Sequence, residues 1–310
     1  MADRELKQVL IPEGLVGERV DSALSKLLGL SRTVIIDLIE VGDVTKKGKR
    51  ITKSQKVELG EHFEVLLPEV KVKGVLTPTP IDNLKVIYDD ADIIVVDKPV
   101  GVAAHASPGW EGPTVIGAIV AVGYEINTSG VAERQGIVQR LDVGTSGLMV
   151  VAKNEFSYSA MKDQFRNRLV KKTYHAMIQG HMDPSEGTID APLDRHPRDD
   201  YKFAVTSGGK PSITHYRSIE FFPAVSLLEI ELETGRTHQI RVHFSALRHP
   251  LVGDLIYGAD HTLAKRLEIT RPWLHACNLE FKHPRTGSLL SFASKYPADL
   301  TRTLEILRNS

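Results

Sequence analysis

The most informative segment of the chain reads Gln139-Arg140-Leu141-Asp142-Val143-Gly144-Thr145-Ser146-Gly147 and continues into Leu148-Met149-Val150-Val151-Ala152. Five consecutive apolar residues after a glycine-containing turn are typical of a buried β-strand. Asp142 lies at the edge of this strand, between an arginine and the turn. On spacing alone, an aspartate that caps the turn through backbone N–H groups is favoured. The alternative is a rigid, partly buried carboxylate that a nearby cation keeps ionised, as a nucleophile or base requires.

The strands around this segment indicate an α+β fold. Residues 84–88 and 93–96 are apolar runs on either side of an Asp89-Asp90 turn, and we expect each to form a strand. Further along the chain, strand-like runs outnumber helical ones and do not alternate regularly with helices. This distribution favours α+β over a doubly wound parallel sheet.

The first part of the chain predicts a separate small module over residues 17–67. Its two helical segments have apolar residues at helical spacing, and two strand-like runs, 43–45 and 63–67, follow them. Residues 68–83 contain three prolines and little helical pattern, which is typical of a linker. A length of 310 residues suggests two domains, so we predict a second, larger domain over residues 84–310.

Charge is balanced over the whole chain but unevenly distributed along it. The 39 Lys and Arg residues equal the 39 Asp and Glu residues, and this neutrality argues mildly against a nucleic-acid partner. Residues 46–56, however, hold six bases and no acid, and residues 162–172 hold five bases and one acid. Each segment can form a local basic surface, although a merely solvated turn explains residues 46–50 equally well.

Several classes of protein are disfavoured by what the sequence lacks. One cysteine, Cys277, rules out an intramolecular disulfide and a cysteine-rich zinc site. There is no phosphate-binding loop, no Gly-x-Gly-x-x-Gly after a strand and no His-Glu-x-x-His, so we expect neither a cofactor nor a metal. We see no signal-peptide pattern, and the apolar runs are too short to span a bilayer. We therefore expect a cytoplasmic protein without a membrane partner.

Four segments, in order along the chain, resemble the motifs of one enzyme family. Arg140-Leu141-Asp142 with Thr145-Ser146-Gly147-Leu148 resembles the catalytic signature of the RluA-type pseudouridine synthases. The other segments are Val95-Val96-Asp97-Lys98-Pro99-Val100-Gly101-Val102 with His105, Lys172-Thr173-Tyr174-His175-Ala176 with Gly180, and Glu233-Thr234-Gly235-Arg236-Thr237-His238-Gln239-Ile240-Arg241-Val242-His243 with His249-Pro250-Leu251-Val252-Gly253-Asp254. The chain is most similar to the RluD-like branch, whose substrate is large-subunit ribosomal RNA. One difference is Gln139, where the family often has histidine.

The amino-terminal module resembles an S4 RNA-binding domain. The similarity lies in the Arg19-Val20-Asp21 start, the Leu30-Ser31-Arg32 step and the Gly42-Asp43-Val44 turn. It implies that RNA is contacted by basic residues of this module, namely Arg32, Lys46, Lys47, Lys49 and Arg50.

The family resemblance implies a fold and a reaction. The fold is the pseudouridine synthase fold, which has a central mixed, largely antiparallel sheet flanked by helices and loops. The reaction breaks the N-glycosidic bond of a uridine in structured RNA, turns the uracil and rejoins it to the sugar through carbon. It therefore requires no redox cofactor and no metal. The uridine must be extruded from the RNA, which costs least for a base in a loop.

The resemblance also implies roles for individual residues. Asp142 corresponds to the essential aspartate of the family, and Arg241 to the arginine that pairs with it as a planar, two-pronged partner. Tyr174 corresponds to the tyrosine that stacks on the target base. Arg140 and Arg236 are expected to contact phosphates or to brace loops. Without the resemblance, Tyr174 is more simply a core aromatic and Arg241 a surface residue of a helix.

Two other functions are compatible with parts of the sequence. A non-catalytic S4-type RNA-binding ribosome assembly factor would need only the amino-terminal module. A nucleoside or sugar hydrolase would use Asp142 with a second carboxylic acid, and no residue is assigned to that role. Transfer RNA is an alternative substrate to ribosomal RNA. We expect a monomer, and we expect His105, His238 and His243 to be structural.

Overall fold

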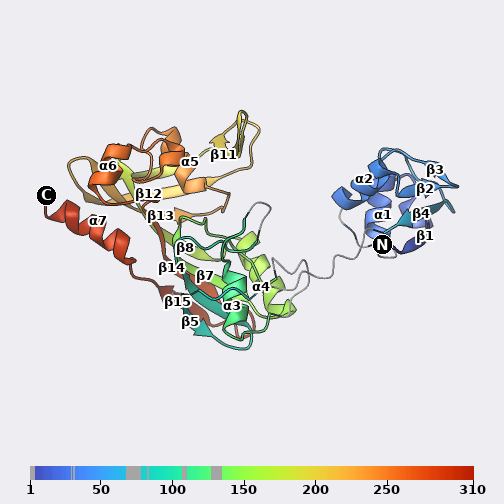
Figure 1. Cartoon of the computed structure of the whole chain (residues 1–310), viewed down its shortest axis with the longest axis horizontal. Helices are drawn as coiled ribbons and strands as arrows, with labels where there is room; N and C mark the ends of the chain where they lie inside the picture. Colours follow the sequence, from blue (N-terminus) through green and yellow to red (C-terminus); the bar gives the residue numbers. More distant parts are fainter. Residues whose placement is uncertain are drawn as a thin grey trace. The chain divides into compact units, whose positions relative to one another are not determined.

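The computed structural model describes residues 4–28, 30, 32–67, 78–81, 84–106, 110–126 and 135–310 (Figure 1). The chain divides into two compact units, Met1–Val75 and Leu76–Ser310, and each has its own hydrophobic core. Of the expected linker, residues 68–83, only residues 78–81 lie within the described part of the chain.

The amino-terminal unit is a four-stranded antiparallel sheet with two helices. Its strands follow the order β1-β4-β2-β3. The elements are β1 (Leu6–Leu10), the 3-10 helix η1 (Glu13–Leu15), α1 (Val20–Leu28), α2 (Arg32–Val41), β2 (Val44–Lys46), β3 (Lys49–Arg50) and β4 (His62–Leu66). Buried residues of the helices and the sheet, such as Leu24, Ile35 and Phe63, pack into one core.

This unit starts earlier in the chain than the sequence predicts. The expected span 17–67 omits β1, which pairs antiparallel with β4 over its whole length. In β1 only Val9 is buried, whereas Leu6 and Leu10 are exposed. The segment therefore lacks the alternation that would indicate a half-buried strand, and its pairing with β4 supplies the strand conformation.

The second unit is built on a nine-stranded mixed sheet, which confirms the α+β prediction. Its strand order is β5-β6-β7-β14-β8-β13-β12-β9, and β15 pairs with β14. The strands are β5 (Lys85–Asp89), β6 (Ile93–Lys98), β7 (Ser146–Ala152), β8 (Lys171–Gln179), β9 (Glu186–Asp190), β12 (Ile213–Phe221), β13 (Val225–Leu232), β14 (Leu274–Lys282) and β15 (Leu289–Ala293). Strands β7 and β14 pair in parallel, and the other neighbours are antiparallel. A separate hairpin joins β10 (Leu193–His196) and β11 (Asp199–Val205).

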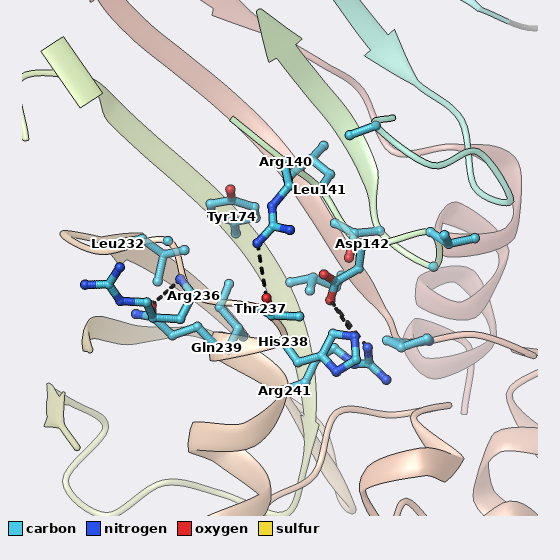
Figure 2. Close-up of a pocket in the computed structure, with 18 of the residues that line it drawn as sticks. Arg140, Leu141, Asp142, Tyr174, Leu232, Arg236, Thr237, His238, Gln239 and Arg241 are labelled. Carbon is cyan, nitrogen blue, oxygen red and sulfur yellow. Dashed lines mark hydrogen bonds and ion pairs between the residues drawn. The ribbon is translucent and has the colours of Figure 1, made fainter. Parts of the chain in front are cut away.

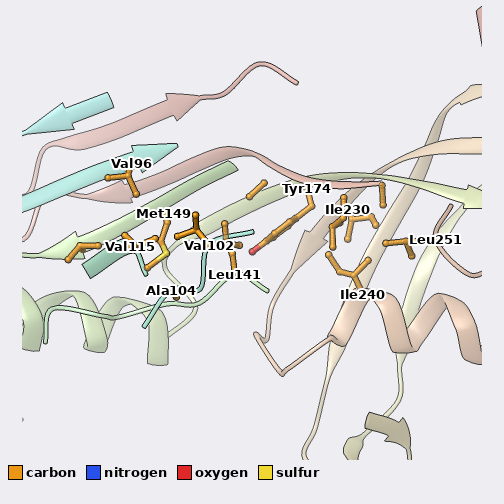
Figure 3. Packing of buried hydrophobic residues seen from close by; sticks show 14 of the residues in the cluster. Val96, Val102, Ala104, Val115, Leu141, Met149, Tyr174, Ile230, Ile240 and Leu251 are labelled. Carbon is orange, nitrogen blue, oxygen red and sulfur yellow. The ribbon is translucent and has the colours of Figure 1, made fainter. Parts of the chain in front are cut away.

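Helices cover both faces of this sheet. One core contains residues of α3 (Val115–Ala121) and α5 (Gln239–Ala246), and Ile94 of β6 packs into it (Figure 3). Cores on the other face contain residues of α4 (Glu155–Arg166), α6 (His261–Arg266) and α7 (Ala298–Arg308), and Ile93 packs there. Neighbouring strand residues enter different cores because successive side chains point to opposite faces of a sheet.

The two layers of helices explain why the central strands are continuously apolar. All residues of β7, Ser146–Ala152, are buried, as expected for a strand that is covered on both faces. The predicted strands at 84–88 and 93–96 are also present, as β5 and β6. Within the described residues, no helix combines the length and the apolar character needed to cross a membrane.

Candidate active site

A cavity of about 470 Å³ lies where the loop before β7 meets β8 and the start of α5 (Figure 2). It brings together five of the residues that the sequence proposes for the site, namely Asp142, Tyr174, Arg241, Arg140 and Arg236. Most of the remaining wall comes from residues 103–105, 143–145 and 235–241. We call it the main cavity.

The Asp142 loop is held by the parallel pairing of β7 with β14. Ser146 lies opposite His275 in this pairing, and its hydroxyl is 2.9 Å from His275 Nδ1. Gly147 has a φ of +116°, and a Cβ at this position would lie 2.3 Å from the carbonyl oxygen of Ala276. Only glycine permits both this backbone conformation and this close approach. The Gly-Thr-Ser-Gly turn therefore anchors the loop to the sheet.

The Asp142 carboxylate faces the main cavity and does not cap the turn. The N–H of Thr145 donates to the backbone carbonyl of Asp142 at 3.0 Å. The side chain is 23% exposed, and its Oδ2 is 3.4 Å from Arg241 Nη1 and 3.9 Å from His238 Nε2. The structure thus favours the interpretation of Asp142 as a partly buried carboxylate beside a cation.

Arg241 is buried, and its two-pronged partner is Asp254. The guanidinium donates to both carboxylate oxygens of Asp254, at 2.6 and 2.9 Å, and lies 4.8 Å from the ring centre of Tyr257. Towards Asp142 it offers one longer contact. The predicted two-pronged pairing with Asp142 is therefore wrong, as is the alternative of a surface arginine. Because Asp254 is also buried, it fixes Arg241 independently of Asp142.

His238 lies beside the carboxylate of Asp142, although the sequence suggests only a structural role for it. Its Nδ1 is 2.8 Å from the hydroxyl of Tyr257, which accepts a hydrogen bond from the N–H of Phe203 at 3.0 Å. Burial lowers the pKa of His238, although the charge of Asp142 opposes this shift. The imidazole is therefore largely neutral at pH 7. When Tyr257 donates to Nδ1, the ring proton is on Nε2, on the side of Asp142.

Tyr174 belongs to both the hydrophobic core and the main cavity. It lies between Leu141 and Ile230 in the cluster on the α3 and α5 face (Figure 3). Burial raises its pKa strongly, and the charge of Asp142 adds to this shift. The phenol is therefore neutral, and Tyr174 is a core aromatic that also lines the main cavity.

The two outer arginines of the main cavity brace loops. Arg140 donates to the hydroxyl of Thr237 at 3.1 Å, and Arg236 Nε donates to the carbonyl of Pro211 at 3.2 Å. Both side chains remain exposed, so they also present charge at the rim of the cavity. Figure 2 shows Arg140 reaching across to Thr237.

Two buried cations hold the backbone at or next to the Asp142 loop, and the sequence gives neither of them this role. Lys98 donates to the carbonyls of Pro99 and Val102, at 3.0 and 2.8 Å, and burial lowers its pKa to about 7. Arg271 pairs with Asp299 of α7 and donates to the carbonyl of Gly144 at 3.2 Å. Arg271 lies outside every recognised motif.

The five basic residues predicted in the amino-terminal module belong to the other unit. Arg32 pairs with Asp21 at 2.8 Å, Lys46 pairs with Glu61, and Arg50 donates to the carbonyl of Val41 at 3.4 Å. Lys47 and Lys49 are exposed, at the turn between β2 and β3 and at the start of β3. Two of these five bases are thus engaged in ion pairs within the unit.

One cluster of possible metal ligands lies outside the main cavity, at Asp90, Asp92 and His283. His283 Nε2 is 2.7 Å from Asp90, and Arg285 donates to both oxygens of Asp92, at 2.7 and 2.6 Å. These groups therefore already satisfy one another. They join the β5–β6 turn to the turn after β14.

Comparison with known proteins gives one consistent result. Residues 92–246 match a family model described as RNA pseudouridylate synthase. An uncharacterized RNA pseudouridine synthase of Mycobacterium bovis is 55% identical over 308 residues, which cover 99% of each chain. The ribosomal large subunit pseudouridine synthase D of Xanthomonas campestris pv. campestris is 37% identical over 317 residues, 99% of this chain and 94% of the relative.

The fold is also similar to a solved structure. The human protein named RNA pseudouridylate synthase domain containing 1 is 29% identical, with a TM-score of 0.56. The similarity covers 71% of this chain and 86% of the human chain.

Proposed function

This chain belongs to the RNA pseudouridylate synthase family, and we propose that it converts specific uridines of large-subunit ribosomal RNA to pseudouridine. Relatives named ribosomal large subunit pseudouridine synthase D support this substrate. The relative from Pseudomonas aeruginosa is 37% identical and, like the one from Xanthomonas, matches over nearly its whole length, 98% of that chain. A ribosomal substrate would place the activity in the cytoplasm.

The observation that carries the proposed chemistry is the position of Asp142. Its carboxylate points into a cavity of nucleoside size and has an arginine on one side and a neutral histidine on the other. We assign to it the reaction with the nucleoside. In the overall conversion the N1–C1′ bond breaks, the C5–C1′ bond forms, the C5 proton leaves and N1 gains a proton.

Arg241 and Tyr174 are proposed to prepare this carboxylate and the base. Arg241 keeps its charge because Asp254 stabilises it, so it holds Asp142 without changing partners during the reaction. Tyr174 is rigidly packed and neutral, which suits a ring that stacks against uracil rather than one that exchanges protons. His238 is well placed to donate to the developing charge beside Asp142.

The amino-terminal unit is proposed to be an S4-like RNA-binding module over residues 17–67 together with β1, joined by a linker to a catalytic domain over residues 84–310. The exposed Lys47 and Lys49 are the bases best placed for phosphate contacts. Arg32, Lys46 and Arg50 would have to exchange their present partners, so we expect smaller contributions from them.

A hydrolase is disfavoured because the second carboxylate near Asp142 is already engaged by an arginine. Glycoside hydrolysis normally needs a protonated acid beside the nucleophile. Asp254 is the nearby candidate, but both of its oxygens already accept hydrogen bonds from Arg241. The pair Asp142 and Asp254 is therefore poorly suited to acid-assisted hydrolysis.

The decisive assay uses large-subunit ribosomal RNA that carries tritium at C5 of uridine. Isomerisation releases tritium to water while the base stays attached to the RNA. We expect release from ribosomal RNA and none from transfer RNA of the same label. RNA binding without tritium release would instead indicate a non-catalytic assembly factor, and free uracil would indicate a hydrolase.

The active unit is proposed to be a monomer. Asp142, Tyr174 and Arg241 meet at the main cavity within one chain. Light scattering after size exclusion should give the mass of one chain at concentrations where tritium release is maximal.

A further inference from the structure

A second cavity, of about 410 Å³, adjoins the main cavity and shares part of its wall. Both cavities are lined by Arg140, Tyr174, Gly235 and Arg236. The rest of the second wall comes from β8, the end of α4 and the segments 138–139 and 233–234. We call it the flanking cavity. Because the two cavities share lining residues, neighbouring nucleotides of one extended RNA strand can occupy both cavities.

The flanking cavity is strongly basic. Five of its lining residues are cations, Arg140, Arg166, Arg168, Lys172 and Arg236, and one is an acid, Glu233. That acid is already engaged, because it pairs with Arg168 and is 2.9 Å from His215 Nε2. The remaining positive charge favours an anionic ligand.

Lys172 is the cation that most clearly lacks a counter-charge. Its side chain is half-buried, its ammonium is 6.0 Å from the ring centre of Phe165, and burial alone lowers its pKa to about 8. Among the described residues, no hydrogen bond or ion pair satisfies it. An unpaired ammonium in such a position is costly unless a ligand supplies the anion. The preceding Lys171 is exposed and pairs with Glu280 at 3.1 Å.

Gln139 adds an unsatisfied donor to the same wall. Its Nε2 is buried and has no hydrogen-bond partner in the described structure. A buried donor without an acceptor costs free energy, so an acceptor on a bound molecule would stabilise it. This is the position at which the sequence departs from the histidine frequent in the family.

We propose that the flanking cavity binds the nucleotide next to the target uridine in the same RNA strand. This inference rests on the proposed function, since it extends the site of that reaction. Lys172 contacts the phosphate that links the two nucleotides. Phe165 packs against the neighbouring base or sugar, and Gln139 donates to an acceptor on it. The reacting uridine is thereby placed by its neighbour as well as by its own contacts.

The test measures binding, so that it does not depend on turnover. Stem–loop fragments of large-subunit ribosomal RNA are ranked by fluorescence anisotropy for affinity to the wild-type chain. The tightest fragment is then remade with one uncharged methylphosphonate linkage at each loop position in turn. We expect one such linkage, adjacent to a uridine, to weaken wild-type binding about tenfold, as removal of a charge-assisted contact should.

The matched variants are Lys172→Met and Lys171→Met, neighbours on opposite faces of β8. Lys172→Met should weaken binding of the unmodified fragment about tenfold but should have no further effect on the sensitive methylphosphonate fragment. Lys171→Met should bind both fragments within about twofold of wild type. Equal losses for Lys172→Met on every fragment, or no sensitive linkage at all, would overturn the proposal.

A second pair of measurements addresses Gln139 and does not depend on the phosphate. Gln139→Leu should weaken binding of the unmodified fragment about fivefold. It should not change the binding of a fragment that is abasic at the nucleotide next to the target uridine. Tritium release by the wild-type chain is recorded in parallel. If tritium is released but the effects of Lys172→Met and Gln139→Leu are the same on unmodified and modified fragments, the flanking site alone is refuted. If those effects depend on the fragment but no tritium is released, only the proposed function is refuted.

Discussion

The main cavity and the flanking cavity share a wall but differ in how completely their polar groups are paired. In the main cavity, Arg241 is held by the two hydrogen bonds that it donates to the carboxylate of Asp254. In the flanking cavity, Lys172 and the amide of Gln139 have no such partners among the described residues. A paired group is preorganised for chemistry, whereas an unpaired one depends on what binds. This difference agrees with the roles that we propose, reaction in the main cavity and recognition in the flanking cavity.

The largest expected effect comes from Asp142→Asn in the main cavity. The amide keeps the shape of the side chain but cannot act as an ionised nucleophile or base, so tritium release should fall about 1,000-fold or more. RNA affinity should stay within about threefold, since the cations of both cavities are unchanged. The exposed Asp194→Asn serves as the control. Substantial turnover by Asp142→Asn would sink the assignment of Asp142.

The second-largest effect is expected from Asp254→Asn, which tests whether Asp254 holds Arg241 rigidly in the main cavity. Asp254→Asn leaves a buried guanidinium with an incomplete partner, so the free energy of unfolding should fall by about 3 kcal/mol. Turnover should drop about 100-fold while RNA affinity changes little. Chemical denaturation and tritium release measure the two effects, again against Asp194→Asn. Wild-type stability and turnover would show that Arg241 needs no such support.

The unpaired state of Lys172 predicts a pH dependence of RNA affinity. Its pKa in the free protein is lowered to about 8, so the ammonium predominates at pH 7 and the neutral amine at pH 9. A phosphate binds the charged form, and binding above pH 8 must therefore take up a proton. Affinity should fall about tenfold between pH 7 and pH 9.

Lys172→Arg is the control for this pH effect, because arginine stays charged throughout and the variant keeps every other group. The other cations of the flanking cavity are arginines. Tyr174 stays neutral because burial raises its pKa. Lys98, whose pKa is about 7, is retained in both proteins. An equal pH dependence in the two proteins would assign the effect to another group.

The smallest effect is expected from bases that are merely exposed. Lys47→Gln with Lys49→Gln removes two charges from the amino-terminal unit, where both side chains face solvent. RNA affinity should weaken about threefold at moderate salt, and the slope of log K against log salt should become shallower by about 1 to 2. An unchanged slope would remove both lysines from the RNA contacts. The RNA contacts that we propose would then be those of the flanking cavity, including Lys172.

Local sequence patterns predicted much of the framework, whereas the role expected for Asp142 came from the family resemblance. The apolar run after Gly147 indicated a buried strand, and the motif around Asp142 indicated the carboxylate that the structure places in the main cavity. The strand prediction succeeded because strand periodicity is set by neighbours in the chain. Spacing alone favoured an aspartate that caps the turn, whereas the structure directs the Asp142 carboxylate to the main cavity. Strand β1 was missed because its few buried positions leave no such pattern.

Partner choice within the site was harder to predict. The sequence indicated that Arg241 and Asp142 meet, but not that Asp254 takes both prongs of the guanidinium. The supporting role of Arg271 was also invisible, because Gly144 lies 127 positions away in the chain. Such contacts depend on which strands become neighbours in the sheet, and the spacing of residues along the chain does not predict these neighbours.

The two basic segments show which properties the sequence determines and which depend on the tertiary structure. By itself, the sequence determined that residues 46–56 and 162–172 are rich in positive charge, and that Asp142 follows an arginine at the edge of a buried strand. Only the tertiary structure decided that Lys46 is paired with Glu61, while Lys172 lines the flanking cavity and has no partner among the described residues. Charge and periodicity are properties of the chain. Pairing and burial arise only when the fold brings distant segments together.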